Sequence, residues 1–477
     1  MQWRWWRRVV DRWKRMRLSM SLTSRDVARI NLNHFGFELC YCTYMLLEVL
    51  IFFSVHCSNE TTEMKLVNNN SLIILFLLLI LAFTELSSLE EGYSRDDFPP
   101  GFVFGSGTSA YQVEGAAEED GRTRSIWDVF AHAGHSGGAT GDVACDQYHK
   151  YKEFGDRVLH WTTINEANVF ALGGYDQGVT PPGRCSLPFG LNCSEGNSPT
   201  EPYIAVHNML LAHASATNLY KKQYQHKQHG SVGISICTYG AAPLSNSTED
   251  KQATARVNDF FIGWVLHPLV FGDYPETMKT RVGSRLPAFT EDESDQVKGA
   301  IDFVGVINYM AVYVKDNSSS LKQNLRDFNI DMAVELTLVG NTSFNNEFAN
   351  TPWSLQQVLL YIKENYGNPP IYIAENGQMT PQSSSLEDTS RIKYLSSHIE
   401  AVLHSLSRKG ANVRGYFQWS LMDLYEVFGG YNMSYGLYYV DFKDPYLNRY
   451  PKLSAHWYSS FLGGRLHHRS HALSSAI

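Results

Sequence analysis

The chain has 477 residues, enough for one large domain or two ordinary ones. Hydrophobic residues make up 44% and aromatic residues 13%, which supports a sizeable core, and aromatic rings also suit the apolar faces of sugars. The formal net charge of −8 argues against bulk binding to nucleic acid.

The N-terminal part is typical of a targeting sequence. Twelve consecutive apolar residues, Leu72–Phe83, follow a short basic start at Met64. This run is too short to span a bilayer comfortably, but it fits a signal-peptide core. We therefore expect residues 64–88 to be a signal peptide-like segment and residues 1–63 to be an upstream extension outside the fold. Alternatively, the Trp- and Arg-rich start is an amphipathic address, or the internal apolar run anchors the long form to a membrane.

Glycosylation sequons and cysteines agree with the secretory pathway, with an extracellular or vacuolar destination. Five Asn-X-Ser/Thr sequons follow the apolar run, at Asn192, Asn246, Asn317, Asn341 and Asn432. Cys185 and Cys193 flank a loop rich in Pro and Gly, and their spacing suits a local disulfide in an oxidising compartment. No Cys or His spacing resembles a zinc site, so we expect neither a metal nor a cofactor.

Beyond the leader, strand-like and helix-like segments alternate. Apolar, β-rich runs occur at Phe102–Thr108, Leu159–Ile164, Val232–Thr238, Phe303–Val314, Ile371–Ala374 and Val413–Trp419. Helical patterns occur at Asp142–Glu153, Tyr203–Lys222, Asn258–Val270, Ser354–Tyr366 and Asp388–Arg408. This alternation predicts one α/β domain with parallel strands over residues 89–477.

Two glutamates stand where predicted strands end. Glu166 closes the run that begins at His160, and Glu375 closes Ile371-Tyr-Ile-Ala-Glu375. In a parallel α/β barrel the carboxyl ends of the strands carry the chemistry, and a pair of carboxyl groups is what cleavage of a glycosidic bond requires. Most acidic residues are solvated surface groups, but the β-rich runs before these two place them inside, each beside an asparagine (Asn165 and Asn376).

Four ordered motifs and the C-terminal part resemble glycoside hydrolase family 1. They are Phe104–Gly115, Trp161–Glu166, Ile373–Gly377, Tyr416–Asp423 and the tail Gly436–Trp457. The resemblance covers about residues 93–465 and is strongest with plant β-glucosidases. It implies a (β/α)8 TIM barrel that hydrolyses terminal β-D-glucosyl residues with retention of anomeric configuration.

By this resemblance, Glu375 is the nucleophile and Glu166 is the acid/base residue, and the partner is a small β-glucoside. The remaining matched positions are sugar or nucleophile contacts: Gln112, Asn165, Tyr309, Trp419 and Glu426. Asn165 would bind the sugar 2-hydroxyl, Gln112 and Glu426 the hydroxyls on the far side of the ring, and Trp419 would form a stacking floor. Tyr309 would hydrogen-bond the nucleophile. Glu rather than Gln at position 166 favours O-glucosides over thioglucosides.

The chain also departs from the family pattern. Only six strands are visible where the barrel has eight, and the family's second and third strands would lie between Glu153 and Phe154. An Arg that supports the nucleophile and a pair of His residues are absent with them. Ala167 replaces the usual Pro, and Val427 replaces a Trp of the glucose site. Two hypotheses follow: an active β-glucosidase, or a catalytically dead family member that misfolds or only binds sugar.

Overall fold

The computed structural model describes residues 92–149, 159–191, 193–340, 347–382, 386–427 and 429–464. All of them belong to one compact unit, Glu90–Ile477. The expected extension at 1–63, the signal peptide-like segment at 64–88 and the junction at Glu153/Phe154 lie outside the described residues. In the described part of the chain, no helix is long and apolar enough to cross a membrane.

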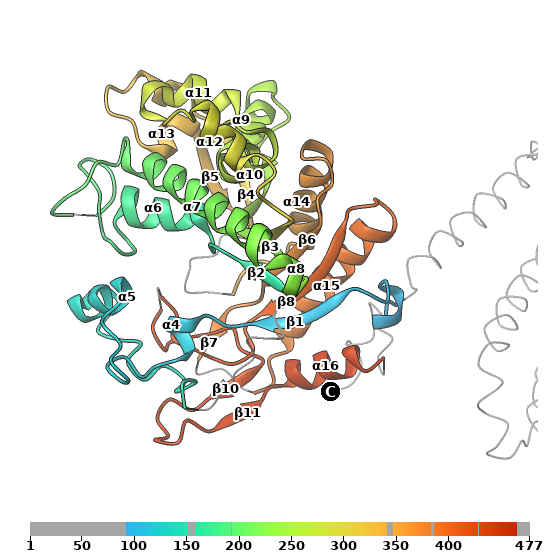
Figure 1. Cartoon of the computed structure of the whole chain (residues 1–477). Coiled ribbons are helices and arrows are strands. Elements are labelled where there is room, and N and C mark those ends of the chain that lie inside the picture. Colours follow the sequence, from blue (N-terminus) through green and yellow to red (C-terminus); the bar gives the residue numbers. More distant parts are fainter. Residues whose placement is uncertain are drawn as a thin grey trace, which may run out of the picture. The chain divides into compact units, whose positions relative to one another are not determined.

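A parallel sheet forms the centre of the unit (Figure 1). Its six parallel strands are β1 (Val103–Gly107), β2 (His160–Thr162), β3 (Ser231–Pro243), β4 (Phe303–Asp316), β6 (Ile371–Asn376) and β8 (Val413–Trp419). Each coincides with one of the six apolar runs, so the strand predictions are confirmed. A short strand that the sequence did not reveal, β5 (Val334–Leu338), pairs antiparallel with the outer part of β4.

The order of the strands shows which part of a barrel is present. The path runs β1-β8-β6-β4-β3-β2. The first strand of the chain therefore pairs with the last, as in a closed barrel, and the remaining strands follow in reverse sequence order. Among the described strands, β1 pairs only with β8 and β2 pairs only with β3, so the path has two free ends. Over the described residues, the sheet is a partial (β/α)8 barrel of six parallel strands, with β5 added at β4.

Helices follow the parallel strands as the alternating pattern predicted. The main ones are α6 (Ala167–Leu172), α7 (Glu201–Gln223), α9 (Thr248–Asn258), α10 (Trp264–Phe271), α14 (Pro352–Asn365), α15 (Thr389–Ser407) and α16 (Leu453–Leu462). Their ends carry ordinary helix signals. Ser247 accepts a hydrogen bond from the Asp250 N–H at the start of α9, and the last turn of α7 contains Lys221 and Lys222.

Shorter elements link these parts. They are η1 (Arg95–Asp97), α4 (Ala110–Val113), α5 (Ile126–Phe130), η2 (Ala131–His135), η4 (Gly173–Gln177), α8 (Gln225–Gln228), η5 (Asp259–Gly263), α11 (Glu276–Val282), η6 (Gly283–Arg285), α12 (Glu291–Val297), η7 (Ser318–Lys322), α13 (Phe328–Met332) and the small strands β7 (Thr380–Pro381), β9 (Met433–Ser434), β10 (Tyr438–Val440) and β11 (Arg449–Pro451).

Two helix predictions need correction. The segment expected to be helical over 142–153 forms turns as far as it is described, to His149. Ala144 and Asp146 have φ angles of 44° and 50°, which a right-handed helix does not accommodate. The second prediction, one helix over Asn258–Val270, is interrupted, because α9 ends at Asn258 and a π-helical turn at 259–263 precedes α10.

The core lies between the sheet and the helices. Alternate residues of the central strands are fully buried in one cluster, among them Ile234 and Ile236, Val304 and Val306, and Ile371 and Ile373. Because every second residue of these strands faces this core, their other side chains face the interior of the partial barrel. The carboxyl ends of the strands meet at one end of the sheet, and the glutamates described next lie there.

Candidate active site

Glu166 lies at the turn that links β2 to α6. Its backbone is left-handed, with φ 50° and ψ 50°, and α6 begins at the next residue. The Glu166 N–H donates a hydrogen bond of 3.0 Å to the carbonyl oxygen of Ser235 on the adjacent strand β3. A left-handed non-glycine residue carries strain that surrounding structure must hold in place, and such strain concentrates at functional sites.

Glu375 is the penultimate residue of β6 and receives two hydrogen bonds. The Tyr309 hydroxyl donates to its Oε2 at 2.7 Å, and Asn165 Nδ2 donates to its Oε1 at 3.1 Å. The second bond joins positions 210 residues apart in sequence. Because Asn165 directly precedes Glu166, the two predicted motifs converge on one place.

Burial and mutual repulsion raise the pKa of both carboxyl groups. Both side chains retain some solvent exposure, but protein atoms surround them on most sides. For Glu166, this burial and then the charge of Glu375 raise the pKa to about 8. Burial also raises the pKa of Glu375, while the hydrogen bonds from Tyr309 and Asn165 act in the opposite direction. The pair can therefore hold one proton near neutral pH, with that proton on Glu166.

The predicted sugar contacts Gln112, in α4, and Glu426, beyond the end of β8, form a second group. Gln112 Nε2 donates to the Tyr425 carbonyl at 2.8 Å and lies 3.4 Å from Glu426 Oε2. Burial, followed by the charges of Glu375 and Asp423, raises the pKa of Glu426 to about 8. Glu426 also has a side-chain hydrogen bond with Trp419, the last residue of β8, so it lies near the carboxyl end of that strand.

Trp419 ends β8 and is 7% exposed, followed by a cis peptide bond to Ser420. Two glycines leave the space that this tryptophan occupies. A Cβ at Gly377 would lie 2.0 Å from the Trp419 carbonyl oxygen, and a Cβ at Gly107 would lie 2.9 Å from its ring. Glycine is therefore required behind the tryptophan, on the strand next to it and on the turn after the proposed nucleophile.

A buried polar network supports Glu375 from behind, and little in the sequence indicated it. Tyr394, on α15, donates its hydroxyl hydrogen to the Tyr309 carbonyl at 2.8 Å. Asn376 Nδ2 donates to the Asn308 carbonyl at 2.6 Å, and Tyr416 donates to Asn376 Oδ1 at 2.6 Å. These bonds fix strands β4, β6 and β8 relative to each other at the site. The one signal was Asn376, a polar residue directly after Glu375.

No basic side chain accompanies these carboxyl groups in the described residues. Glu166, Glu375 and Glu426 form no ion pair there, and the main influences on their pKa values are burial, other carboxyl groups and hydrogen bonds. Within the same ranges, no group of three or more His, Cys, Asp or Glu residues could hold a metal ion. The site is a cluster of carboxyl groups, and the partners of Glu375 are the Asn165 amide and the Tyr309 hydroxyl group.

The remaining predicted positions are the two cysteines and the glycosylation sequons. Cys185 and Cys193 form the predicted disulfide. Asn246 and Asn432 are exposed and Asn317 is half-buried, whereas Asn192 and Asn341 lie outside the described residues. Glycosylation of any of them stays a prediction.

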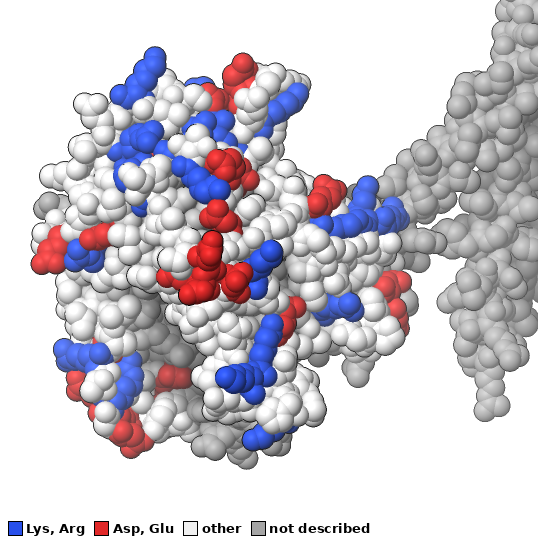
Figure 2. Space-filling model, turned by 45° about the horizontal axis from the view of Figure 1, so that its top comes forward, with Lys and Arg blue, Asp and Glu red and all other residues white. Residues whose placement is uncertain are grey.

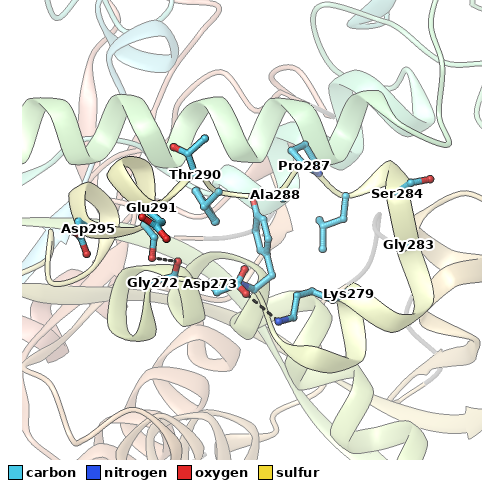
Figure 3. Close-up of a pocket in the computed structure, with 14 residues that line it drawn as sticks. Gly272, Asp273, Lys279, Gly283, Ser284, Pro287, Ala288, Thr290, Glu291 and Asp295 are labelled. Atoms are coloured by element: carbon cyan, nitrogen blue, oxygen red, sulfur yellow. Dashed lines mark hydrogen bonds and ion pairs between the residues drawn. The ribbon is translucent and has the colours of Figure 1, made fainter.

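A separate surface hollow of about 670 Å³ lies beside α11 and α12 (Figure 3). Lys279 forms a 2.9 Å ion pair with Asp273 at its rim, and none of the predicted site residues lines it. On the face shown in Figure 2, acidic and basic side chains are interspersed over the described surface. The strand ends, which carry the predicted site residues, therefore remain the candidate active site.

Comparison with known proteins identifies the lineage. The model of glycosyl hydrolase family 1 matches residues 94–153 and 150–465. The chain is 62% identical to Beta-glucosidase 11 of Arabidopsis thaliana over 526 aligned positions, covering 86% of this chain and 100% of that protein. It is 44% identical to Hydroxyisourate hydrolase of Glycine max over 490 positions, covering 83% and 87%.

Solved structures agree with the sequence matches. A crystal structure of the rice Os3BGlu6 beta-glucosidase has 34% sequence identity and a TM-score of 0.73, and the match covers 78% of this chain and 99% of that one. The beta-glucosidase of the fungus Humicola insolens, in complex with glucose, has 27% identity and a TM-score of 0.69, with 77% and 98% covered. With these matches added to the convergent glutamates, the chain belongs to glycosyl hydrolase family 1 and is of plant β-glucosidase type.

Proposed function

We propose that this chain acts on terminal β-D-glucosyl residues of O-glucosides by a retaining, two-step mechanism. The observation that carries the proposal is the convergence of Glu166 and Glu375 on one site, linked by the 3.1 Å hydrogen bond from Asn165. A separation of about 5–5.5 Å between the two carboxyl groups is the value that a retaining mechanism requires, and for this chain it stays a prediction.

In the first step, the Glu375 carboxylate attacks the anomeric carbon and forms a glycosyl ester as the bond to the leaving oxygen breaks. Glu166 gives its proton to that oxygen. In the second step, Glu166 removes a proton from water, the water oxygen attacks the anomeric carbon, and the ester bond to Glu375 breaks. The raised pKa of Glu166, about 8, supports its role as the proton donor at neutral pH.

The substrate class follows from the acid residue and from the relatives. A glutamic acid at position 166 can protonate a poor alkoxide leaving group. Relatives named as beta-glucosidases support a glucosyl substrate, whereas the relative named Hydroxyisourate hydrolase shows that matched proteins bear other activities. A terminal β-glucoside is therefore the first substrate to test.

The test is hydrolysis of an aryl β-glucoside by the purified full-length chain. Turnover that Glu375→Gln abolishes and Glu364→Gln retains would support the proposal, because Glu364 is an exposed residue of α14. A chain that gives a folded circular-dichroism spectrum but no turnover would contradict it.

A specific observation favours the second candidate, a family member that has lost catalysis. Within the described ranges, the sheet has free ends at β1 and β2, where a complete barrel has two more strands. The family model matches in two segments that meet at 150–153, and the 526-position alignment with the Arabidopsis relative exceeds the 477 residues of the chain. We infer that two βα units are missing there, and the nucleophile's usual Arg with them.

Sequencing the transcript across Glu153/Phe154 tests this inference. An alternative transcript that carries about 60–90 additional codons, the length of two βα units, would support it. A single transcript without them, from a gene that encodes an active enzyme, would contradict it. Binding of glucose without turnover by the purified chain would favour the second candidate over the first.

Entry into the secretory pathway is also a proposal. It is supported by the apolar run Leu72–Phe83 and by the two exposed sequons, Asn246 and Asn432. Expression in plant cells should give a form whose electrophoretic mobility increases after treatment with an N-glycan-removing enzyme. An unchanged mobility together with a retained N-terminus would contradict it.

A further inference from the structure

Behind the sugar-contact segment lies a buried ionic network that the mechanism does not use directly. Its members are Lys452, Asp423, Ser434, Arg391 and Asp388. All are at most 5% exposed. Two buried cations and two buried carboxylates are held in this network, and such groups persist in a protein interior only when they are paired and hydrogen-bonded.

Lys452 contacts two segments of the chain, one at Asp423 and one at Ser434 and Gly436. Its Nζ donates to Asp423 Oδ1 at 2.7 Å, to Ser434 Oγ at 2.6 Å and to the Gly436 carbonyl at 2.9 Å. Asp423 Oδ1 also accepts from Ser434 Oγ at 2.7 Å and from the Gly436 N–H at 3.0 Å. Asp423 lies three residues before Glu426, so the ammonium group fixes the segment that carries this proposed sugar contact.

Arg391 extends the network to the segment that follows the nucleophile. It donates to the Gln378 carbonyl at 2.6 Å, to Thr380 Oγ1 at 2.8 Å and to the Ser434 carbonyl at 3.3 Å. Asp388 pairs with the guanidinium at 2.8 Å. Gln378 is three residues after Glu375, so the same network touches the chain after both β6 and β8.

The backbone between Ser434 and Gly436 adds a further connection. The Tyr435 carbonyl accepts from the Ser420 N–H at 3.1 Å and from Gln418 Nε2 at 3.0 Å. A Cβ at Gly436 would lie 2.1 Å from the Asp423 nitrogen, so the two segments are in direct backbone contact. Displacement of either segment would therefore move the chain around Trp419 and Glu426.

We propose that Lys452 is a positioning residue for sugar recognition: its ammonium group clamps the 423–426 segment to the 434–436 segment and so holds Glu426 toward the hydroxyls on the far side of the glucose ring. This inference rests on the proposed function. The charge of Asp423 already raises the pKa of Glu426, and loss of the neighbouring cation would leave that charge without its partner.

The test measures binding, which does not require turnover. Two probes differ by one group: 1-deoxynojirimycin, a cyclic amine with the hydroxyls of glucose, and its analogue without the hydroxymethyl group. Calorimetry on the full-length chain gives the ratio of the two affinities. Lys452→Met should weaken 1-deoxynojirimycin by roughly tenfold or more, as expected for loss of contacts that involve charged groups, and should bring the ratio closer to one.

Lys443→Met is the matched control, because Lys443 is exposed, and it should leave both affinities unchanged. A merely structural role would reduce the fraction of binding-competent protein but not the ratio. If Lys452→Met does not fold, Ser434→Ala gives the second reading, since it removes the bridging hydroxyl and keeps both charges. It should reduce the ratio by a smaller factor.

The outcomes separate the two proposals. Binding by the wild type with an unchanged ratio in Lys452→Met, or in Ser434→Ala where that variant is needed, overturns the positioning role alone. A folded wild type that binds neither probe overturns the proposed function and this inference together. A reduced ratio with an unchanged control supports both.

Discussion

Replacement of Glu166 by Gln should stabilise the folded chain at pH 8 and leave its stability unchanged at pH 4. Burial and the charge of Glu375 raise the pKa of Glu166 from 4.5 to about 8. A carboxyl group whose pKa is raised by folding contributes its full stability below its unfolded value, near pH 4.5, and loses it as the pH rises through about 8. The amide of Gln has no proton to lose, so the variant avoids this loss.

The magnitude follows from the same pKa values. The difference between 4.5 and about 8 corresponds to at most about 5 kcal/mol at 1.36 kcal/mol per pKa unit. Solvent reaches the half-buried side chain and Glu375 shares the repulsion, so we expect about 2–3 kcal/mol at pH 8. In a domain of this size, that is a rise of a few degrees in the thermal midpoint.

The assay is thermal unfolding of the wild type and of Glu166→Gln between pH 4 and pH 8, followed by circular dichroism. Glu364→Gln serves as the control because Glu364 is exposed on α14, and its midpoint should follow the wild type at every pH. A difference between Glu166→Gln and the wild type that does not grow with pH would refute the reasoning, whatever the activity of the chain.

Three further predictions follow from the site. Gly377→Ala should lower the free energy of unfolding by about 3 kcal/mol or more, because its Cβ would meet the Trp419 carbonyl oxygen at 2.0 Å. The control is Gly101→Ala, whose Cβ would meet nothing within 4 Å and which should change the free energy of unfolding by less than about 1 kcal/mol. Equal denaturant midpoints for the two variants would contradict this prediction. Tyr309→Phe removes a 2.7 Å hydrogen bond to Glu375, so kcat/KM for an aryl glucoside should fall roughly 10- to 100-fold. Because that hydrogen bond lowers the pKa of Glu375, the acidic limb of the pH profile should move to higher pH in the variant. An unchanged pH profile would argue against the contact. The wild type itself should unfold at a higher temperature at pH 5 than at pH 8, because folding raises the pKa of several carboxyl groups to about 8; the opposite order would show that other groups dominate.

The strands could be predicted from sequence because each is a short apolar run between turn signals. All six parallel strands lie at the expected runs. Glu375 is the penultimate residue of β6 as expected, whereas Glu166 lies four residues beyond the end of β2, in the turn before α6. By contrast, β5 was missed because it has only five residues, although Val334-Glu-Leu-Thr-Leu338 alternates apolar and polar residues as a strand does. The helix predicted from Asp142 was wrong because Ala144 and Asp146, which are compatible with a helix in sequence, adopt left-handed backbone angles in the structure. Tertiary contacts set these angles, and the local sequence does not show them.

The support of the site could not be predicted in the same way. Lys452 and Arg391 are charged residues in polar stretches, and such residues are solvated in most proteins. Their burial becomes visible only when segments far apart in sequence come together around Asp423. Local patterns therefore locate the carboxyl groups, whereas the groups that orient them depend on tertiary structure.

The free ends of the sheet have a consequence for engineering. The strand β1 leads toward Gln112 and the strand β2 leads toward Glu166, so each free edge carries a different part of the proposed sugar site. The interior pairs from β8 to β3 are continuous. On the inference that two βα units are missing, the chain corresponds to the larger part of a split barrel, and a separately expressed fragment with two βα units of a relative could be tested for complementation in trans.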